Sequence, residues 1–522
     1  MKRYTNLIIL AAALVTAACV FIIKNVNYGD LLMTAGVYDG KVSIANTADV
    51  HGHLVFDDEV GGYYSMEDVS VIMGLPLIKH FVDDLRNRNK DTLFLDSGDF
   101  FHGTNEANLN KGEGLVKAAN LMGYNAMVPG NHDFNFGFDR LLKIKSELDF
   151  PILSANIYKD GELAFEEYSV LDVGGVKIGL FGLTTPWALS FNNSRDNDGV
   201  TIEDPVKSAL RVVPILKDKA DIVVLISHLG DDVDEEVVKK VDGIDLVLAG
   251  HYHNLYKSAK KIGDTYIVEA GGWTTHLGIA DIYLKNNKVA GVSWKVITSK
   301  DKSLTDKELN KIAQEYHTLA LESAKEVLGK TEVKLNGIRS QLRSKETNLG
   351  NLLADAMRAY GNADIALMNG GGIRESIPQG EINLYKIGKV LPFSNSLVIV
   401  EMKGDKIYRA IERGIRDYTS GVNGGFLQVS GIKYVFDGSK PAGERLISVE
   451  KDGQPLDRNK YYLVATNDYL YNGGDNYEEF KNIRLVSMGS LLKDVLAQYI
   501  KSQGTVSPCE EGRIKVINER YK

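Results

Sequence analysis

The sequence predicts an α/β protein with two domains, and three observations carry that prediction. Between residues 41 and 299, short β-rich apolar runs alternate with amphipathic helical patterns, as they do in layered α/β domains. Residues 300–330 are rich in Lys, Glu, Ala and Leu and lack proline, which is typical of a connecting helix. A second alternating segment covers residues 331–517 and is expected to form the other α/β domain.

The N-terminus indicates export. Met1-Lys2-Arg3 precedes Leu7–Ile23, which is apolar except for Thr16. A basic start before a short apolar stretch matches a secretory signal, and the stretch also reaches the lower length limit of a membrane span. Residues 1–29 are therefore expected to be a signal peptide or an N-terminal membrane anchor. Either way, the folded part is expected outside the cytoplasm: at the cell surface, in a periplasm or secreted.

Composition excludes several classes of protein. Of the 522 residues, 44% are apolar and 25% charged, which excludes a disordered chain or a polytopic membrane protein. The formal net charge of −8 gives no electrostatic attraction for polymeric nucleic acid. Contact with a membrane is expected only through the N-terminal segment, if it is retained. The two cysteines, Cys19 and Cys509, exclude a disulfide framework, and nothing in the sequence fixes an oligomeric state.

Four buried strands and one amphipathic helix can be placed in the first domain. The strands are expected at residues 42–45, 92–95, 222–226 and 244–248, because each is a short apolar β-rich run. The helix is expected at residues 75–89, between the first two of these strands.

Five polar clusters in this domain each come directly after a strand-like run: Asp49–Gly52, Asp96–Asp99, Gly130–Asp133, Ser227-His228 and Gly250–His253. Strand ends are where open α/β sheets place their ligand crevice, so the clusters are expected to converge. Half of the ten histidines lie in them. Each motif alone is more often a surface turn, but all five in this order point to one site.

The residue types in these clusters indicate metal ions. Carboxylates, imidazoles and an amide oxygen together suit Zn or Mn rather than Ca or a thiolate site. In Asp-x-His and His-x-His, residues i and i+2 of an extended backbone point the same way and can reach one ion. Two ions about 3.5–4 Å apart can clamp the attacking and leaving oxygens of a phosphoryl displacement. The expected cofactor is therefore two divalent ions per chain.

The second domain carries a glycine-rich loop that can bind a ligand. Met368–Arg374 comes after the strand expected at residues 364–367, and its successive glycines let backbone amides approach a ligand closely. The guanidinium of Arg374 supplies a planar fork suited to phosphate or ribose oxygens. The alternative is a loop without function. Three further motifs are Glu346–Leu352, Phe426–Gly431 and Asn472–Tyr477.

Together these motifs resemble the calcineurin-like metallophosphatases and, over residues 41–517, the secreted 5′-nucleotidase / UDP-sugar hydrolase / 2′,3′-cyclic-nucleotide phosphodiesterase family. The resemblance implies a four-layer β-sandwich flanked by helices at residues 41–299. It also implies a connecting helix at 300–330 and a smaller α/β nucleotide-binding domain at 331–517.

The resemblance also implies roles for the site residues. One metal would be bound by Asp49, His51, Asp99 and His253, and the other by Asp99, Asn131, His228 and His251, so that Asp99 bridges the two. His132 would be the catalytic histidine that steadies the transferring phosphoryl group, while a metal-activated water attacks phosphorus.

For the substrate, the resemblance implies that Phe426 and Tyr477 sandwich the base. Arg343, Asn369, Gly371 and Arg374 are the other expected substrate contacts. The ribose-binding carboxylate of relatives has no secure counterpart here, although Glu478, Glu479 and Asn482 lie close to Tyr477.

One departure from the family pattern leaves the substrate open. Many 5′-nucleotidases have aspartate where this chain has Asn135, three residues after the catalytic histidine. Asn135 can orient the imidazole through its carbonyl oxygen but lacks the charge. The leading interpretation is hydrolysis of nucleoside 5′-monophosphates. The alternatives are a 2′,3′-cyclic-nucleotide 2′-phosphodiesterase/3′-nucleotidase, a UDP-sugar hydrolase, and a non-catalytic surface binding protein.

Overall fold

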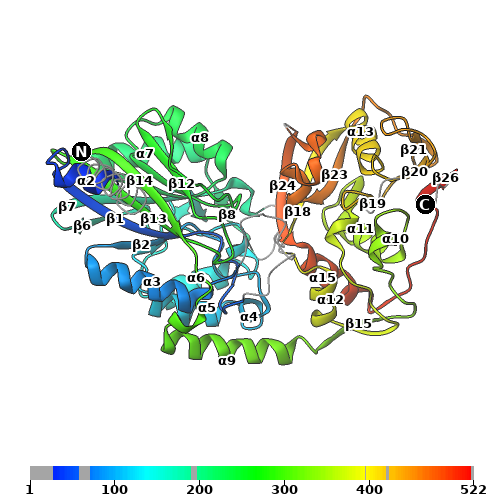
Figure 1. Ribbon diagram of the computed structural model, residues 1–522, viewed down its shortest axis with the longest axis horizontal. Helices are drawn as coiled ribbons and strands as arrows, with labels where there is room; N and C mark the ends of the chain where they lie inside the picture. Colours follow the sequence, from blue (N-terminus) through cyan, green and yellow to red (C-terminus); the bar gives the residue numbers. More distant parts are fainter. Residues whose placement is uncertain are drawn as a thin grey trace, which may run out of the picture.

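The computed structural model describes residues 28–57, 71–189, 197–393, 395–418, 423–481 and 483–518. The predicted leader, apart from its last two residues, and Asn482 lie outside the described residues. Within these ranges, no helix is both long and apolar enough to cross a membrane. The chain forms two lobes, an N-terminal and a C-terminal domain, as Figure 1 shows.

Two sheets form the centre of the N-terminal domain, with strand orders β14-β13-β1-β2-β3 and β11-β12-β10-β9-β7-β6. The strands of the first are β1 (Gly40–Thr47), β2 (Leu93–Asp96), β3 (Ala126–Met127), β13 (Leu277–Lys285) and β14 (Lys288–Ile297). Those of the second are β6 (Tyr168–Val173), β7 (Val176–Thr184), β9 (Ile222–His228), β10 (Leu246–Ala249), β11 (Lys260–Ile262) and β12 (Thr265–Glu269). β1, β2 and β3 run parallel, as do β7, β9, β10 and β12. The four predicted strands are present, with their ends shifted by at most two residues.

Side-chain alternation along the strands produces four layers. In β1, Ile44 packs into the core between the sheets, whereas Ala45 packs into the core beneath the helices on the outer face. Leu180 and Phe181 of β7 divide in the same way. Successive strand residues point to opposite faces, so each sheet is covered on both sides. The predicted helix–sheet–sheet–helix sandwich is thus confirmed.

The helices cover the two outer faces of this sandwich. The outer core of the first sheet contains residues of α3 (Gly74–Arg88), α5 (Glu113–Met122) and α6 (Phe138–Glu147). The outer core of the second sheet contains residues of α7 (Pro205–Lys217) and α8 (Asp231–Lys240). Smaller elements are α2 (Tyr28–Thr34), α4 (Asn105–Asn108), β4 (Ile157–Lys159), β5 (Glu162–Leu163), β8 (Val200–Ile202) and the short 3-10 helices η1 (His132–Phe134), η2 (Pro186–Leu189) and η3 (Lys302–Leu304).

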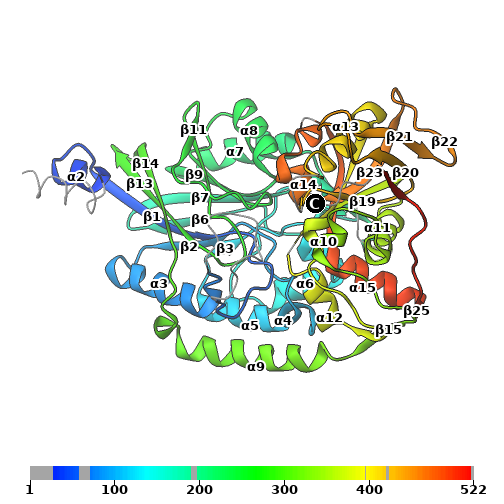
Figure 2. The same cartoon turned by 45° about the vertical axis from the view of Figure 1, so that its right-hand side comes forward.

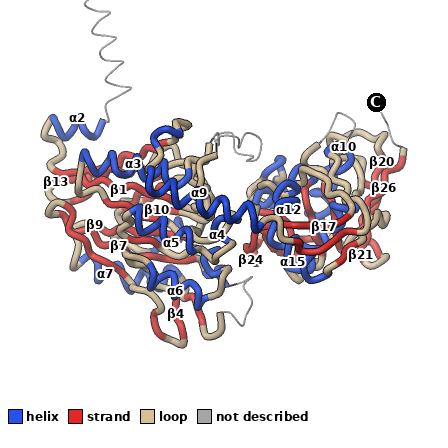
Figure 3. Tube along the Cα trace, turned by 90° about the horizontal axis from the view of Figure 1, so that it is seen from below, coloured by secondary structure: helices blue, strands red, loops and turns tan. Residues whose placement is uncertain are grey.

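The predicted connecting helix is α9 (Lys307–Ser323), and it packs along the N-terminal domain, as Figures 2 and 3 show. Its buried residues recur every three or four positions: Leu309, Ala313, Tyr316 and Ala320. That spacing places them on one helical face. The predicted span of 300–330 ends inside β15 (Val327–Thr331), which pairs with strands of the C-terminal domain.

The C-terminal domain has a five-stranded sheet, β19-β16-β23-β18-β24, between two cores. Its strands are β16 (Ile365–Asn369), β18 (Ser396–Lys403), β19 (Leu427–Ser430), β23 (Tyr461–Asn467) and β24 (Arg484–Leu491). Helices α11 (Asn348–Tyr360), α12 (Leu384–Val390) and α15 (Leu492–Gln503) pack into one core, and α13 (Gly404–Gly414) into the other. The remaining elements are α10 (Arg339–Leu342), η4 (Gly370–Gly372), α14 (Asp468–Tyr471), η5 (Gly474–Asn476), η6 (Glu478–Phe480), β17 (Gly380–Asn383), β20 (Lys433–Asp437), β21 (Leu446–Lys451), β22 (Gln454–Pro455), β25 (Thr505–Val506) and β26 (Ile514–Ile517). In Figure 1, β18 and β24 face the N-terminal domain.

Candidate active site

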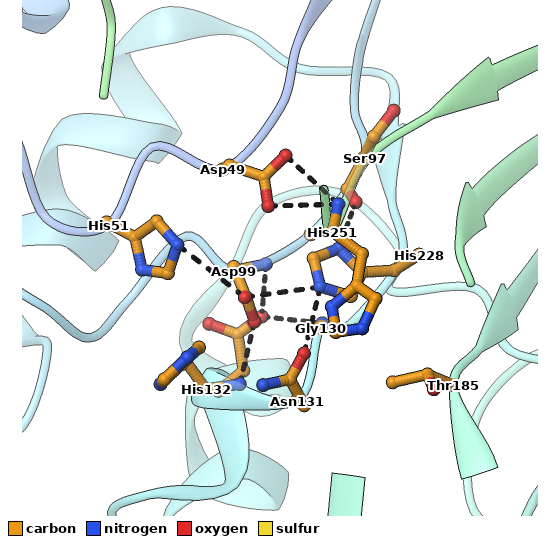
Figure 4. A network of polar contacts seen from close by, with 12 residues as sticks. Asp49, His51, Ser97, Asp99, Gly130, Asn131, His132, Thr185, His228 and His251 are labelled. Carbon is orange, nitrogen blue, oxygen red and sulfur yellow. Dashed lines mark hydrogen bonds and ion pairs between the residues drawn. The ribbon is translucent and has the colours of Figure 1, made fainter. Parts of the chain in front are cut away.

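The five polar clusters meet at the edge where the parallel strands of both sheets end. Loops after β1, β2, β3 and β10, together with the last residue of β9, supply the side chains that Figure 4 shows pointing toward one another. Asp49 and His51 come after β1, Asp99 comes after β2, and His228 ends β9. Parallel strands bring their carboxyl ends to one edge, which is why residues far apart in sequence converge here.

Two groups of side chains have the spacing of metal ligands. Ligand atoms of Asp49, His51 and His253 lie within 4.8 Å of one another, and those of Asp99, His228 and His251 do the same. The Asp99 carboxylate lies between the groups, because its Oδ2 is 3.2 Å from His228 Nε2 and 3.7 Å from His51 Nε2. Asn131 Oδ1 is 3.2 Å from His228 Nε2 and joins the second group.

Hydrogen bonds outside the groups fix which ring nitrogens face inward. His51 Nδ1 donates to the carbonyl oxygen of His102 at 3.3 Å, and His228 Nδ1 donates to that of Ser97 at 2.7 Å. The Nε2 atoms of both rings are therefore directed into the site, as in histidines that bind metal. His51 Nε2 lies 3.1 Å from His253 Nε2, so two imidazole nitrogens converge where a cation would satisfy both.

Electrostatics favours a cation in this site. Burial lowers the pKa of His51 and of His251 well below the usual range, so both rings are neutral at pH 7. Burial opposes ionisation of Asp99, but His228, His132 and His51 outweigh it and hold the pKa of its carboxyl well below the usual range. Neutral imidazoles and an ionised carboxylate are the forms that bind metals.

The pKa of His228 shows the same attraction of the site's carboxylates for positive charge. Burial opposes protonation of its ring, but Asp99 and Asp49 outweigh burial and raise its pKa to about 10. The carboxylates therefore draw a proton onto His228, and a bound cation would compete with that proton for the same charge. Burial also opposes protonation of His253, whose pKa is nevertheless raised by Asp49.

The backbone at this site adopts an unusual conformation. Five of the candidate ligands have positive φ angles: Asp49 (50°), His51 (46°), Asp99 (55°), His251 (81°) and His253 (57°). Non-glycine residues rarely take this left-handed region, which costs on the order of 1–3 kcal/mol per residue. Strain that gathers at one place is a mark of a functional site.

Asp133 holds two of the ligand loops together, a role that the sequence analysis did not assign. Its carboxylate accepts the backbone N–H groups of Asp99 (3.0 Å), Phe100 (3.0 Å), Phe101 (2.9 Å) and Gly130 (2.8 Å). The loops approach so closely that a Cβ on Gly130 would lie 2.2 Å from Asp99 Oδ1. In the sequence, Asp133 is only an acidic residue next to glycine-containing loops, and that pattern does not show which backbone groups its carboxylate contacts.

His132 lies beside the metal-ligand groups and is 2% exposed. Its backbone N–H donates to Asp99 Oδ1 at 2.7 Å, and its ring Nδ1 is 3.1 Å from Asn135 Nδ2. Burial lowers the pKa of His132 to about 4 against the pull of Asp99, so the ring is neutral at pH 7. Asn135 contacts it through the amide nitrogen, so the expected contact through the carbonyl oxygen is wrong.

A cavity of about 510 Å³ lies between the domains at this site. The N-terminal domain lines it with Asp99, His132 and His253 among others, and the C-terminal domain with Ser396, Asp468 and Tyr469 among others. A second pocket of about 280 Å³ lies in the C-terminal domain and is lined by Arg339, Arg343, Asn369, Gly371, Arg374 and Phe393, among other residues. Asn395 and Tyr469 line both, so the two cavities adjoin.

The second pocket gathers four predicted substrate contacts: Arg343, Asn369, Gly371 and Arg374. Arg339, which the sequence analysis did not select, is a third arginine there. Arg343 is 7% exposed, and its Nε has no hydrogen-bond partner among the described residues. Burial lowers its pKa, as do the charges of Arg339 and Arg374. Crowded guanidinium groups with an unused donor suit an anionic ligand.

The structure contradicts the prediction that Phe426 and Tyr477 sandwich a base. Both side chains are fully buried in the core of the C-terminal domain. The ring of Phe426 packs against Phe436 with centroids 6.3 Å apart, and the Tyr477 hydroxyl donates to the carbonyl oxygen of Gly425. A ring with no exposed surface has neighbours on both faces and no room for a base. The aromatic residues that line the second pocket are Phe393 and Tyr469.

Comparisons with known proteins agree with this architecture. The family model for calcineurin-like phosphoesterases matches residues 42–255, and the model for the 5′-nucleotidase C-terminal domain matches residues 327–482. Protein UshA of Yersinia enterocolitica is 30% identical over 516 residues, which cover 88% of this chain and 90% of that protein. A 5′-nucleotidase of Diplobatis ommata is 28% identical over 525 residues, covering 91% and 90%. A solved 5′-nucleotidase precursor from Thermus thermophilus is 30% identical, with a TM-score of 0.57, covering 92% of this chain and 100% of that one.

Proposed function

The chain belongs to the 5′-nucleotidase family, in which a calcineurin-like phosphoesterase domain precedes a 5′-nucleotidase C-terminal domain, and it is a phosphoric ester hydrolase. On that premise we propose that it releases phosphate from nucleoside 5′-monophosphates outside the cytoplasm, using two divalent metal ions. The observation that carries this proposal is the junction of the two cavities at Asn395 and Tyr469. A phosphate among the metal-ligand groups and a nucleoside reaching toward the second pocket would lie on one continuous path.

The donor set fits the expected ions. One group offers Asp49, His51 and His253, the other Asn131, His228 and His251, and Asp99 lies between them. Mixed nitrogen and oxygen donors without thiolates suit Zn or Mn. Bound there, divalent ions supply Lewis-acid chemistry, lowering the pKa of water and neutralising phosphoryl charge.

The chain's own residues orient and enclose the reacting group. Because Nδ1 of His132 accepts a hydrogen bond from Asn135 Nδ2, its neutral ring carries the proton on Nε2. His132 lines the cavity, so this N–H can donate to a phosphoryl or leaving oxygen. In the second pocket, Arg339, Arg343 and Arg374 provide donors for anionic groups of the substrate, and Tyr469 offers a ring for stacking.

Asn135 is the reason for also testing 2′,3′-cyclic nucleotides as substrates. An aspartate at this position would place a negative charge beside the His132 ring, whereas the amide supplies only a hydrogen bond.

The proposed domain boundaries of 41–299 and 331–517, and a location outside the cytoplasm, rest on the sequence patterns described above.

The test is phosphate release by the purified protein. The substrates are AMP, 3′-AMP, 2′,3′-cyclic AMP with added phosphatase, and UDP-glucose, each with Zn or Mn and with a chelator control. Preference for AMP, abolished by the chelator, is expected. Preference for the cyclic substrate or UDP-glucose would replace the substrate assignment, and no release from any substrate would favour a binding protein.

A further inference from the structure

A chain of polar contacts leads from the candidate catalytic histidine across the domain interface. Asn135 Nδ2 lies 3.1 Å from His132 Nδ1 and 3.2 Å from His102 Nδ1. The Nε2 atom of His102 lies 3.4 Å from Asp494 Oδ2. Asp494 is in the first turn of α15, in the C-terminal domain, whereas His102 comes after β2 in the N-terminal domain. Four side chains therefore connect the site to the other domain.

Hydrogen-bond chemistry gives this chain a single consistent direction. The Asn135 amide nitrogen has two hydrogens and can donate one to each imidazole Nδ1. Both Nδ1 atoms then accept, which is the arrangement of imidazole rings that carry a single proton on Nε2. The Nε2 atom of His102 lies at ion-pair distance from the Asp494 carboxylate, and the Nε2 atom of His132 lies 3.3 Å from Ser396 Oγ at the cavity.

The charge of Asp494 and the burial of the two imidazole rings are consistent with this direction of hydrogen bonding. Burial opposes ionisation of Asp494, but contact with His102 and the nearby charges outweigh it, so its pKa lies below the usual range and it is a carboxylate at pH 7. The two imidazole planes are nearly parallel, 5° apart, with centroids separated by 5.8 Å. His102 is 6% exposed and His132 2%, so little solvent competes for their hydrogen bonds.

We propose that Asp494 and His102 are positioning residues for His132, acting through Asn135, and that the C-terminal domain completes the catalytic site in this domain arrangement. Asn135 has no negative charge; Asp494 of the other domain supplies one, separated from Asn135 by the His102 ring. Asp494 fixes the tautomer of His102, His102 fixes the orientation of the Asn135 amide, and that amide directs the His132 Nε2–H to the cavity. This inference rests on the proposed function, because it assigns a partner to the proposed catalytic histidine.

The kinetic test compares Asp494→Ala, Asp494→Asn and His102→Ala with Gln498→Ala, an exposed residue on the same helix. Loss of Asp494 is expected to lower kcat for AMP roughly 10- to 100-fold, the range for partners that orient an active-site group, and to leave KM unchanged. KM is spared because Asp494 does not line either cavity. Asp494→Asn keeps an acceptor oxygen and should lose less, and Gln498→Ala should behave as wild type.

The double variant His102→Ala/Asp494→Ala should be no slower than His102→Ala alone, because both residues act in one chain. Multiplicative losses, or a wild-type kcat for Asp494→Ala, would overturn the proposal. Thermal unfolding identifies a variant that fails to fold, and in that case Asp494→Asn decides the outcome.

A second measurement does not depend on turnover. The ring ¹⁵N resonances of the full chain labelled at histidine report which nitrogen of His102 and of His132 carries the proton. Wild type should show Nε2–H for both rings, and Asp494→Ala should lose that uniform pattern. An unchanged pattern would overturn the proposal. If wild type hydrolyses none of the tested nucleotides but shows the expected pattern, the proposed function fails while the positioning contacts stand.

Discussion

Replacing Asp133 tests whether its carboxylate holds the metal-ligand loops together. Oδ1 accepts the N–H groups of Phe100 and Phe101, and Oδ2 accepts those of Asp99 and Gly130. In Asp133→Asn, one oxygen becomes an NH₂ group, so two backbone N–H groups lose their acceptor whichever way the amide turns. An unsatisfied buried donor costs about 1–3 kcal/mol, so the variant should lose roughly 2–6 kcal/mol of stability.

This loss is a large fraction of the stability of a typical domain, about 5–15 kcal/mol. The assay is the free energy of unfolding of the N-terminal domain in urea, measured above the pKa of Asp133, which burial and Asp99 raise to about 6. The control is Asp139→Asn, an exposed residue in the next helix, which should change stability by less than about 0.5 kcal/mol. Equal stability of the two variants would refute the role of Asp133.

Two further predictions concern the pocket and pH. Tyr469→Ala should raise KM for AMP but not for p-nitrophenyl phosphate, which has no base. Phe426→Ala should instead destabilise the C-terminal domain by about 3–5 kcal/mol, because it empties a core position; the reverse pattern would restore Phe426 as a stacking residue. Burial lowers the pKa of His53 to about 4, whereas in the unfolded chain it takes up a proton near its usual value of about 6.5. Acidification between those values therefore favours unfolding, and wild type should lose stability relative to His53→Asn as the pH falls through that window. A pH-independent difference between the two would contradict this assignment.

The metal-ligand residues could be selected from sequence because their positions are tied to strand ends. A short apolar run predicts a buried strand, and parallel strands bring the loops after them to one edge, so Asp49, Asp99 and His251 could be grouped without a structure. The helix α9 could also be predicted from the sequence, because its apolar residues keep helical spacing. Its packing against the N-terminal domain depends on partners such as Glu113, which accepts a hydrogen bond from the Tyr316 hydroxyl.

The aromatic residues of the C-terminal domain show where sequence reasoning stops. Phe426 and Phe393 both lie near glycine or polar residues, yet one is buried against Phe436 and the other lines a pocket. Tertiary packing decides between these outcomes, and a loop motif does not encode it. The contact of Asn135 with His102 was equally inaccessible, as was the contact of His102 with Asp494, because Asp494 belongs to the other domain and no local pattern links these residues.

Two divalent ions that share Asp99 are proposed to be needed for hydrolysis. The most direct measurement is the metal-to-protein ratio of the purified protein and of Asp99→Asn, with phosphate release from AMP measured on the same samples. Wild type should hold two ions per chain, and the variant should lose at least one ion together with nearly all phosphate release. A variant that keeps both ions and normal turnover, or a wild type that is active without bound metal, would contradict the account.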